Sequence, residues 1–270
     1  MSRPARRARL WGRLPGLGAL VVASLGLGAC SNTAGTCDGS PGQPVESPLH
    51  QPPGFRAFSD RTWNSLTGNG WSYARRTSSK DDNIVVDWSA PRFPRKVLRI
   101  VFTRDMAPNA EPSVHWICLP SVKAVYTAWW VKLSPNWTSS PAGGGKITFL
   151  HTPTGQVYTG FFGSSAPHHL SVNTEWAPYG QRIWDPNVTT TPLGYGQWYR
   201  MEWYMQWESG PGTGDGVMRW WVNGVLNGDY SNVSYPSDAG FDQFEFAPTL
   251  QNPPPAEQYM YVAQTYVGIP

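Results

Sequence analysis

Several polar side chains in the middle of this 270-residue sequence are of types that could break a sugar polymer by elimination. Removing the proton next to a uronate carboxylate needs a base, commonly His or Tyr, and a group that neutralises the carboxylate, commonly Arg, Lys, Gln or Asn. The residues of these types are Lys146, His151, Tyr158, Arg200, Tyr204 and Arg219. Four of them, Lys146, His151, Arg200 and Tyr204, are the candidate catalytic residues of a polysaccharide lyase.

Two of these candidates also have a structural explanation. His151 lies near the end of an expected strand, where a histidine is commonly exposed or satisfied by its neighbours. Arg200 could pair with the carboxylate of Glu202 or Glu208 on its own strand. Residue type alone leaves both explanations open.

A second chemistry, hydrolysis of a glycosidic bond, needs two carboxylates about 5–5.5 Å or about 6.5–9.5 Å apart. Glu202 and Glu208 fall on one face of an expected strand, but six residues at about 3.3 Å each separate them by about 20 Å. Glu202 could instead pair with one of three other acids. These are Glu175, Asp185 and Glu245.

The function that we favour over these two chemistries is binding of polysaccharide without cutting it. Sugars stack on aromatic rings, and the sequence holds 15 Trp, 12 Tyr and 10 Phe. Because neighbouring strand residues face opposite ways, one member of Trp129-Trp130 and one of Trp220-Trp221 should leave the core. The expected substrate-binding residues are Trp130, Trp221, Glu202 and Arg219. The sequence leaves open whether the protein is an enzyme, and if it is, favours a lyase over a hydrolase.

The first 29 residues have the pattern of an export signal. Five arginines, between Arg3 and Arg13, precede an apolar stretch of about 16 residues, which is shorter than the roughly 20 that span a membrane. The stretch ends in Leu-Gly-Ala-Cys, which resembles a lipobox and makes Cys30 the expected lipidation site. We therefore expect an exported bacterial lipoprotein, held to the membrane by its lipid alone, with the folded part outside the cytoplasm.

Charge and cysteine content exclude other classes of function. Without the five signal arginines, 16 basic residues face 18 acidic ones, so no cationic surface is expected to bind nucleic acid. Cys37 and Cys118 could pair in an oxidising compartment, which the sequence leaves open. Two cysteines without a Cys-x-x-Cys or His partner predict no metal site, and no cofactor is expected.

The composition divides the chain into three parts. Residues 1–29 are the signal, and residues 30–54 are a flexible linker rich in Gly, Pro and Ser. Residues 55–270 contain short β-branched and aromatic runs broken by Gly, Pro, Asn and Asp. About eleven strands and no helical periodicity predict an all-β, two-sheet antiparallel sandwich.

One strand shows strict alternation. In residues 198–208, Tyr199, Met201, Trp203, Met205 and Trp207 are expected in the core, and the alternate residues on an exposed or cleft-lining face. Residues 217–225 follow as the second strand of a hairpin. Asn223-Gly224 predicts a two-residue turn at positive φ.

These segments carry a family resemblance. Residues 196–203 with Asp215-Gly216 and residues 220–224 resemble the G-x-W-x-R-x-E … D-G … W-x-N-G run of the concanavalin A-like jelly rolls, closest to polysaccharide-lyase-like bacterial lipoproteins. Residues 126–134, 145–147 and 259–268 resemble further strands of that superfamily, so the similarity covers about 55–268.

The resemblance implies a jelly roll with a concave face that holds a sugar chain. That fold hosts lyases, hydrolases and lectins, so it does not decide the function. Relatives often carry an acid near a structural calcium in the last strand. Residues 262–265 read Val-Ala-Gln-Thr here, so a structural calcium is possible by family analogy but not supported by this chain.

Overall fold

The computed structural model describes residues 49–139, 145–176, 180–235 and 238–270, which form fifteen strands and no helix. No membrane-spanning helix occurs among these residues. The strands are β1 (Arg56–Arg61), β2 (Trp71–Arg75), β3 (Asn83–Val86), β4 (Lys96–Phe102), β5 (Ser113–Val122), β6 (Ala124–Leu133), β7 (Gly145–Thr152), β8 (Gly155–Phe162), β9 (His169–Trp176), β10 (Gly180–Trp184), β11 (Tyr199–Gln206), β12 (Gly216–Val222), β13 (Val225–Val233), β14 (Phe241–Leu250) and β15 (Gln258–Ile269).

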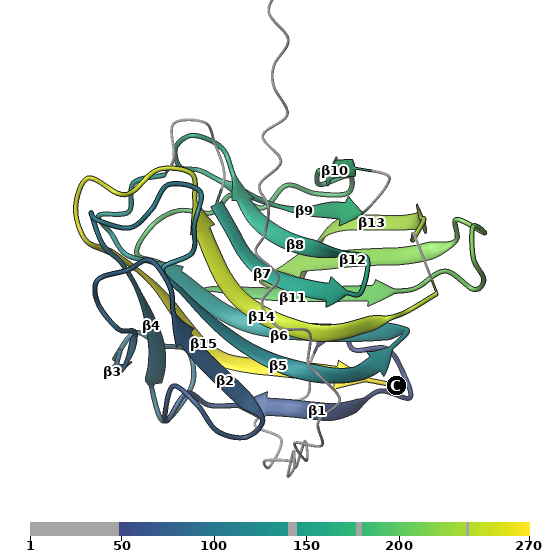
Figure 1. Ribbon diagram of the computed structural model, residues 1–270, viewed down its shortest axis with the longest axis horizontal. Coiled ribbons are helices and arrows are strands. Elements are labelled where there is room, and N and C mark those ends of the chain that lie inside the picture. Colours follow the sequence, from purple (N-terminus) through teal and green to yellow (C-terminus); the bar gives the residue numbers. More distant parts are fainter. Residues whose placement is uncertain (1–48, 140–144, 177–179, 236–237) are drawn as a thin grey trace, which may run out of the picture. The chain divides into compact units, whose positions relative to one another are not determined.

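The strands form two antiparallel sheets that pack face to face. The eight-stranded sheet has the order β13-β12-β11-β6-β15-β4-β3, with β1 paired to β15. The seven-stranded sheet has the order β10-β9-β8-β7-β14-β5-β2. Figure 1 looks onto the seven-stranded sheet, with the eight-stranded sheet behind it. This is the predicted sandwich, and it is consistent with a jelly roll.

Aromatic side chains fill the space between the sheets. Trp129, Trp203 and Trp220 of the eight-stranded sheet are fully buried, as are Phe244 and Phe246 of the other. The rings of Trp129 and Phe246 meet edge to face at 6.0 Å between centroids. Each such side chain stabilises the fold by about 1.5–3 kcal/mol through its removal from water. The alternation predicted for β11 is confirmed on this inner face, where Met201, Trp203 and Met205 are buried.

The turn predicted at Asn223-Gly224 is also confirmed. Both residues have positive φ, 51° and 79°, and they join β12 to β13. Four strands, β1, β5, β10 and β13, come in addition to the eleven or so expected from the sequence. β13 contains Asn227, Gly228 and Asp229, residue types that are rare in strands, so its pairing with β12 overrides local preference.

The outer face of β11 differs from the prediction. Arg200, Glu202 and Tyr204 were expected on an exposed or cleft-lining face, but all three are buried. The cause lies before β1: His50 contacts Glu202 and Phe55 packs edge-on against Tyr204 at 6.0 Å. A segment assigned to the flexible linker therefore includes a residue that covers the sheet.

Candidate functional site

The structure places the sequence-predicted residues on two opposite faces of the sandwich. Lys146, His151 and Tyr158 lie on the outer face of the seven-stranded sheet, where the pairing aligns Phe149 with Tyr158 and His151 with Gln156. The others lie on the outer face of the eight-stranded sheet. They are Trp130, Arg200, Glu202, Tyr204, Arg219 and Trp221. Both inner faces and the core separate the two groups, so Lys146 and His151 cannot form one catalytic site with Arg200 and Tyr204, and the candidate set of four is wrong as a single site.

On the seven-stranded sheet, His151 is held by a carboxylate from the neighbouring strand. His151 Nε2 lies 2.7 Å from Glu245 Oε1 of β14. Gln243 donates to the other oxygen of the same carboxylate at 2.8 Å. This arrangement fixes the imidazole through Nε2, while the side chain stays 28% exposed at the surface of the sheet. A carboxylate-oriented histidine is the usual form of a general base.

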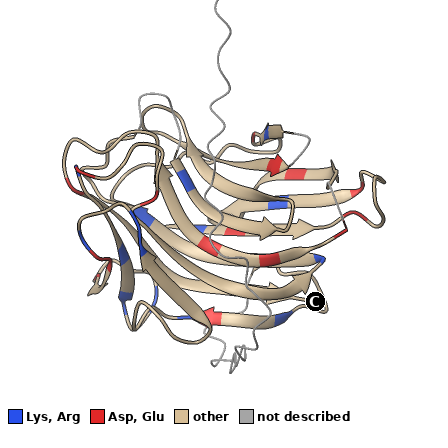
Figure 2. Cartoon of the chain, in the orientation of Figure 1, with Lys and Arg blue, Asp and Glu red and all other residues tan. Residues whose placement is uncertain are grey.

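A row of side chains extends from His151 across β7 and β8. The Phe149 ring stacks on His151, with 5.9 Å between centroids, and the Lys146 ammonium lies 5.7 Å from the Phe149 ring. The same ammonium is 4.3 Å from the Tyr158 ring. The row therefore combines an imidazole, an apolar platform, a cation and a phenol within reach of one or two sugar units. Figure 2 shows the basic band near the start of β7 and the acidic bands on β14.

Tyr158 is only 3% exposed and its hydroxyl is held in place. Gln181 Nε2 of β10 donates to it at 2.6 Å. Burial raises the pKa of Tyr158, and the nearby Glu175 carboxylate raises it further. At neutral pH the phenol therefore keeps its proton and is suited to donate it rather than to act as a base.

Beyond Tyr158 the same face carries Glu175 and Asn173 of β9. Glu175 receives a hydrogen bond from Gln156 at 2.5 Å and lies 3.5 Å from the Lys146 ammonium. Asn173, the cross-strand neighbour of Tyr158, is fully buried, and neither its Oδ1 nor its Nδ2 has a hydrogen-bond partner among the described residues. An unpaired buried amide costs about 1–3 kcal/mol, so it is the kind of group expected beside a binding site.

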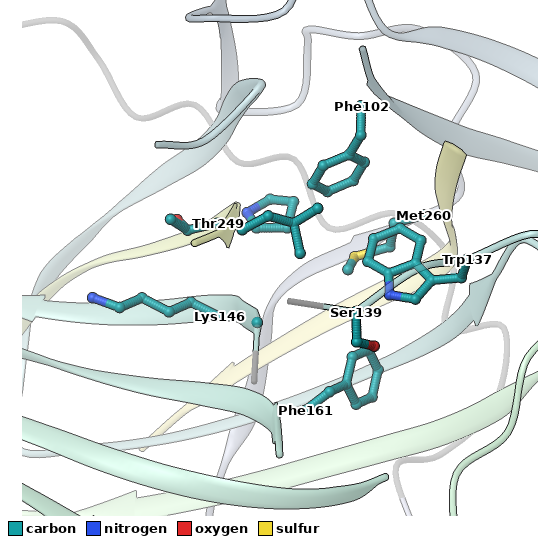
Figure 3. A pocket seen from close by; sticks show the side chains of 10 residues that line it. Phe102, Trp137, Ser139, Lys146, Phe161, Thr249 and Met260 are labelled. Atoms are coloured by element: carbon teal, nitrogen blue, oxygen red, sulfur yellow. The ribbon is translucent and has the colours of Figure 1, made fainter. Parts of the chain in front are cut away.

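Lys146 reaches this face from the end of the sandwich. Lys146 is one of the residues that line a small pocket, most of whose other residues are aromatic or aliphatic. In Figure 3 the ammonium extends away from the Trp137 and Phe161 side chains. The aliphatic part of the lysine side chain thus packs at the end of the core, and its ammonium group stays on the sheet face. The side chain as a whole is 34% exposed.

On the other sheet, Glu202 is a fully buried structural carboxylate. It accepts hydrogen bonds from the Tyr126 hydroxyl, from Arg200 Nε at 3.4 Å and from the His50 backbone at 3.2 Å. The His50 ring stacks on Trp221, 4.7 Å between centroids. The protein's own His50 therefore occupies the expected sugar platform at Trp221, which is 8% exposed, and Arg200 pairs with Glu202.

The remaining candidates on that sheet also have structural partners. Tyr204 donates to Gln206 at 2.5 Å, and burial raises the pKa of Tyr204. Arg219 forms a half-exposed ion pair with Asp229 at 2.7 Å. Trp130 leaves the core as predicted, and the Arg200 guanidinium lies 5.9 Å from its ring. None of these contacts leaves a group arranged for acid–base chemistry.

The geometry also tests the carboxylate pairs of a hydrolase. Glu202 lies on one outer face, and both Glu175 and Glu245 lie on the other. Glu175 and Glu245 share their face, but β9 and β14 are three strand spacings apart, which is about 14 Å. That distance exceeds the separation at which two carboxylates flank one glycosidic bond.

Within the described ranges no group of three His, Cys, Asp or Glu residues is placed to hold a metal ion. Cys118 is disulfide-bonded. Cys30 and Cys37 lie outside the described residues, so lipidation at Cys30 and the pairing of Cys37 with Cys118 stay predictions.

From the sequence, Glu175 and Glu245 were candidates for hydrolysis only, and four further polar residues of this face were not candidates at all. They are Gln156, Asn173, Gln181 and Gln243. A signal was present, because in β14 Gln243 and Glu245 alternate with buried Phe244 and Phe246. The pairing of β14 beside β7, which brings Glu245 to His151, has no such local signal.

No protein-family model matches the sequence, and no curated protein matches it. Among solved structures, the chain is similar to an endo-β-1,4-glucuronan lyase from the fungus Trichoderma reesei, at 15% identity and a TM-score of 0.53. That match covers 75% of this chain and 92% of the lyase. The alginate lyase vAL-1 from Chlorella virus matches at 16% identity and a TM-score of 0.53, over 80% of this chain and all of the lyase. At this identity the similarity establishes the sandwich fold.

Proposed function

We propose that this protein is a polysaccharide lyase that cleaves a uronate-containing glycan on the outer face of its seven-stranded sheet. The observation that carries the proposal is the His151–Glu245 pair beside Lys146 and Tyr158. The fold shared with a glucuronan lyase and an alginate lyase supports the same reaction class.

In the proposed reaction, His151 removes the proton from the carbon next to the uronate carboxylate, and Glu245 stabilises the imidazolium that forms. The Lys146 ammonium neutralises the developing charge on the carboxylate, with the Asn173 amide as the neighbouring polar group. The electron pair of the broken C–H bond forms the new double bond, and the glycosidic C–O bond breaks. Tyr158, which stays protonated, donates its proton to the leaving oxygen.

A second candidate function is binding of the same glycan without cleavage. It is favoured by the fact that the imidazole and the ammonium of the face both already have carboxylate partners, His151 with Glu245 and Lys146 with Glu175. Such pairs can recognise a sugar chain without turnover. We propose further that the chain is exported and anchored through Cys30, which places either function at the cell envelope.

The test is incubation of the protein with uronate-containing and neutral polysaccharides, with ultraviolet absorbance of unsaturated uronate and reducing ends measured in parallel. We expect absorbance to appear with uronate polymers only. His151→Ala should lower the rate by about 10²–10⁴-fold, whereas Arg219→Gln on the opposite face should leave it unchanged. Retention on a uronate polymer without new absorbance would support the binding function, and reducing ends without absorbance would contradict both.

A further inference from the structure

The eight-stranded sheet carries a second hollow at its β3 edge, far from the row on the seven-stranded sheet. A pocket of about 480 Å³ lies over β3, β4, β6 and β15. This volume falls within the range typical of sites for small ligands. The residues that define it are Asp87, Trp88, Ser89, Arg99, Lys132 and Tyr261.

Aromatic rings border this hollow. Trp88 is 78% exposed, which is unusual for a tryptophan in a folded protein. The Arg95 guanidinium donates to the Trp88 carbonyl at 2.5 Å and lies 5.8 Å from its ring, so the backbone that carries the exposed ring is held. The rings of Tyr261 and Trp198 each lie 5.0 Å from the Lys132 ammonium.

The polar groups of the hollow are fixed in advance. Lys132 donates to Asp87 and to Ser89 Oγ, the latter at 3.0 Å. Burial alone would raise the pKa of Asp87, but the hydrogen bonds from Lys132 and Ser89 outweigh it and lower the pKa. Trp198 Nε1 also donates to Ser89 Oγ, at 3.1 Å. Groups held in this way lose little freedom when a ligand binds.

The lining has an excess of positive charge. Arg99 and Lys132 face one carboxylate, Asp87. Arg99 Nε donates to Asn83 Oδ1 at 2.9 Å, which uses one of the five N–H donors of the guanidinium. A guanidinium binds a carboxylate through two parallel hydrogen bonds, so Arg99 suits a uronate group. Figure 2 shows basic segments on β4, the strand that carries Arg99.

From these contacts we infer that the hollow at the β3 edge is a second, non-catalytic site for an anionic oligosaccharide. A sugar ring stacks on Trp88, and a uronate carboxylate binds Arg99. The sugar hydroxyls meet the fixed groups of Lys132 and Asp87. The site would hold a polymer on the face opposite the proposed catalytic row, and its existence does not depend on whether the protein cleaves that polymer.

The test is a calorimetric titration of the full-length His151→Ala protein with an oligogalacturonate, with a glucose oligomer as neutral probe. On that background, Trp88→Ala should remove one binding event or weaken binding about fivefold. Arg99→Gln should weaken it similarly and make binding less sensitive to salt. Phe93→Ala is the matched control, because Phe93 is 83% exposed on the same loop but does not line the hollow.

Each outcome decides the inference separately from lyase activity. Loss of binding in Trp88→Ala and Arg99→Gln, with Phe93→Ala unchanged, supports the site even if wild type produces no unsaturated uronate. Unchanged binding in both variants, or equal binding of the glucose oligomer, overturns it. Because Trp88 is exposed, the thermal midpoint of Trp88→Ala should stay at that of the parent protein, and a loss of binding is then local.

Discussion

At the scale of single residues, two carboxylates determine how the polar side chains on the two outer faces are oriented. Glu245 orients His151 on one face, and Glu202 is buried under His50 and Arg200 on the other. Each of the two carboxylates contacts a histidine ring, His151 or His50, but only the first contact leaves the histidine on an open face of the sheet. His151 keeps part of its ring accessible, whereas Glu202 has no exposure and therefore serves the fold.

The first residue-scale prediction concerns Glu245→Gln. The amide keeps a similar shape but cannot stabilise the imidazolium, so kcat should fall by about 100-fold with little change in KM. Initial rates from uronate absorbance measure this split. Asp229→Asn, which removes the carboxylate paired with Arg219, is the matched control. A parallel rise in KM with unchanged kcat would instead assign Glu245 to substrate binding.

The second residue-scale prediction concerns Asp215, between β11 and β12. Hydrogen bonds from Ser209 and Thr213 lower the pKa of Asp215 to about 2. A lowered pKa stabilises the fold fully above the unfolded value of about 3.9 and loses this effect as the pH falls toward 2. Asp215→Asn should therefore lower the thermal midpoint at pH 7 but match wild type near pH 2. A pH-independent difference between the two proteins would contradict this explanation.

At the scale of strands, β13 approaches the core so closely at Gly228 that there is no room for a side chain. A Cβ on Gly228 would lie 2.1 Å from the Trp220 ring, which is fully buried between the sheets. The indole cannot move away, because its Nε1 donates to the Leu170 carbonyl at 3.2 Å. A residue that favours turns is therefore required inside a strand.

This contact predicts the effect of Gly228→Ala. The added methyl group overpacks a filled core and should lower the free energy of unfolding by about 1–3 kcal/mol. Chemical denaturation measures the difference. Gly210→Ala is the control, since its Cβ would meet nothing closer than 3.6 Å, and it should leave stability nearly unchanged. Equal destabilisation by both variants would mean that chain flexibility, not the clash, is responsible.

At the scale of the whole molecule, the two outer faces are different surfaces. The seven-stranded sheet presents the His151 row, and the eight-stranded sheet is partly covered by the segment before β1. The segment is held to the sheet by His50, which contacts Glu202 and Trp221. It covers Trp221, which was expected from the sequence to bind sugar.

The covering segment makes a testable contribution to stability. His50→Ala should lower the free energy of unfolding by about 1–3 kcal/mol, because a buried carboxylate loses a hydrogen-bond partner and an indole loses its cover. Urea denaturation at neutral pH measures it. His169→Ala provides the comparison, because the His169 ring lies 3.6 Å from the exposed Asp185 and should contribute little. An unchanged midpoint for His50→Ala would show that the cover contributes nothing to stability.

Local patterns predicted the fold and part of the site. Period-two alternation in β11 and the Asn223-Gly224 turn depend on neighbours within a few residues, so both were readable from the chain. Lys146 and His151 were named from residue type and do share a face. Arg200 and Tyr204 were named in the same way but lie on the other sheet, since residue type does not tell which sheet a strand joins.

The sequence by itself determined a two-sheet β-sandwich, with aromatic residues in its core and a tight turn at Asn223-Gly224. It did so because strand periodicity and turn conformation are properties of short segments. The tertiary structure alone decided which polar residues meet. Glu245 reaches His151 across 94 residues and His50 reaches Glu202 across 152. Strand order sets those meetings, and strand order follows from the packing of the whole chain rather than from any segment of it.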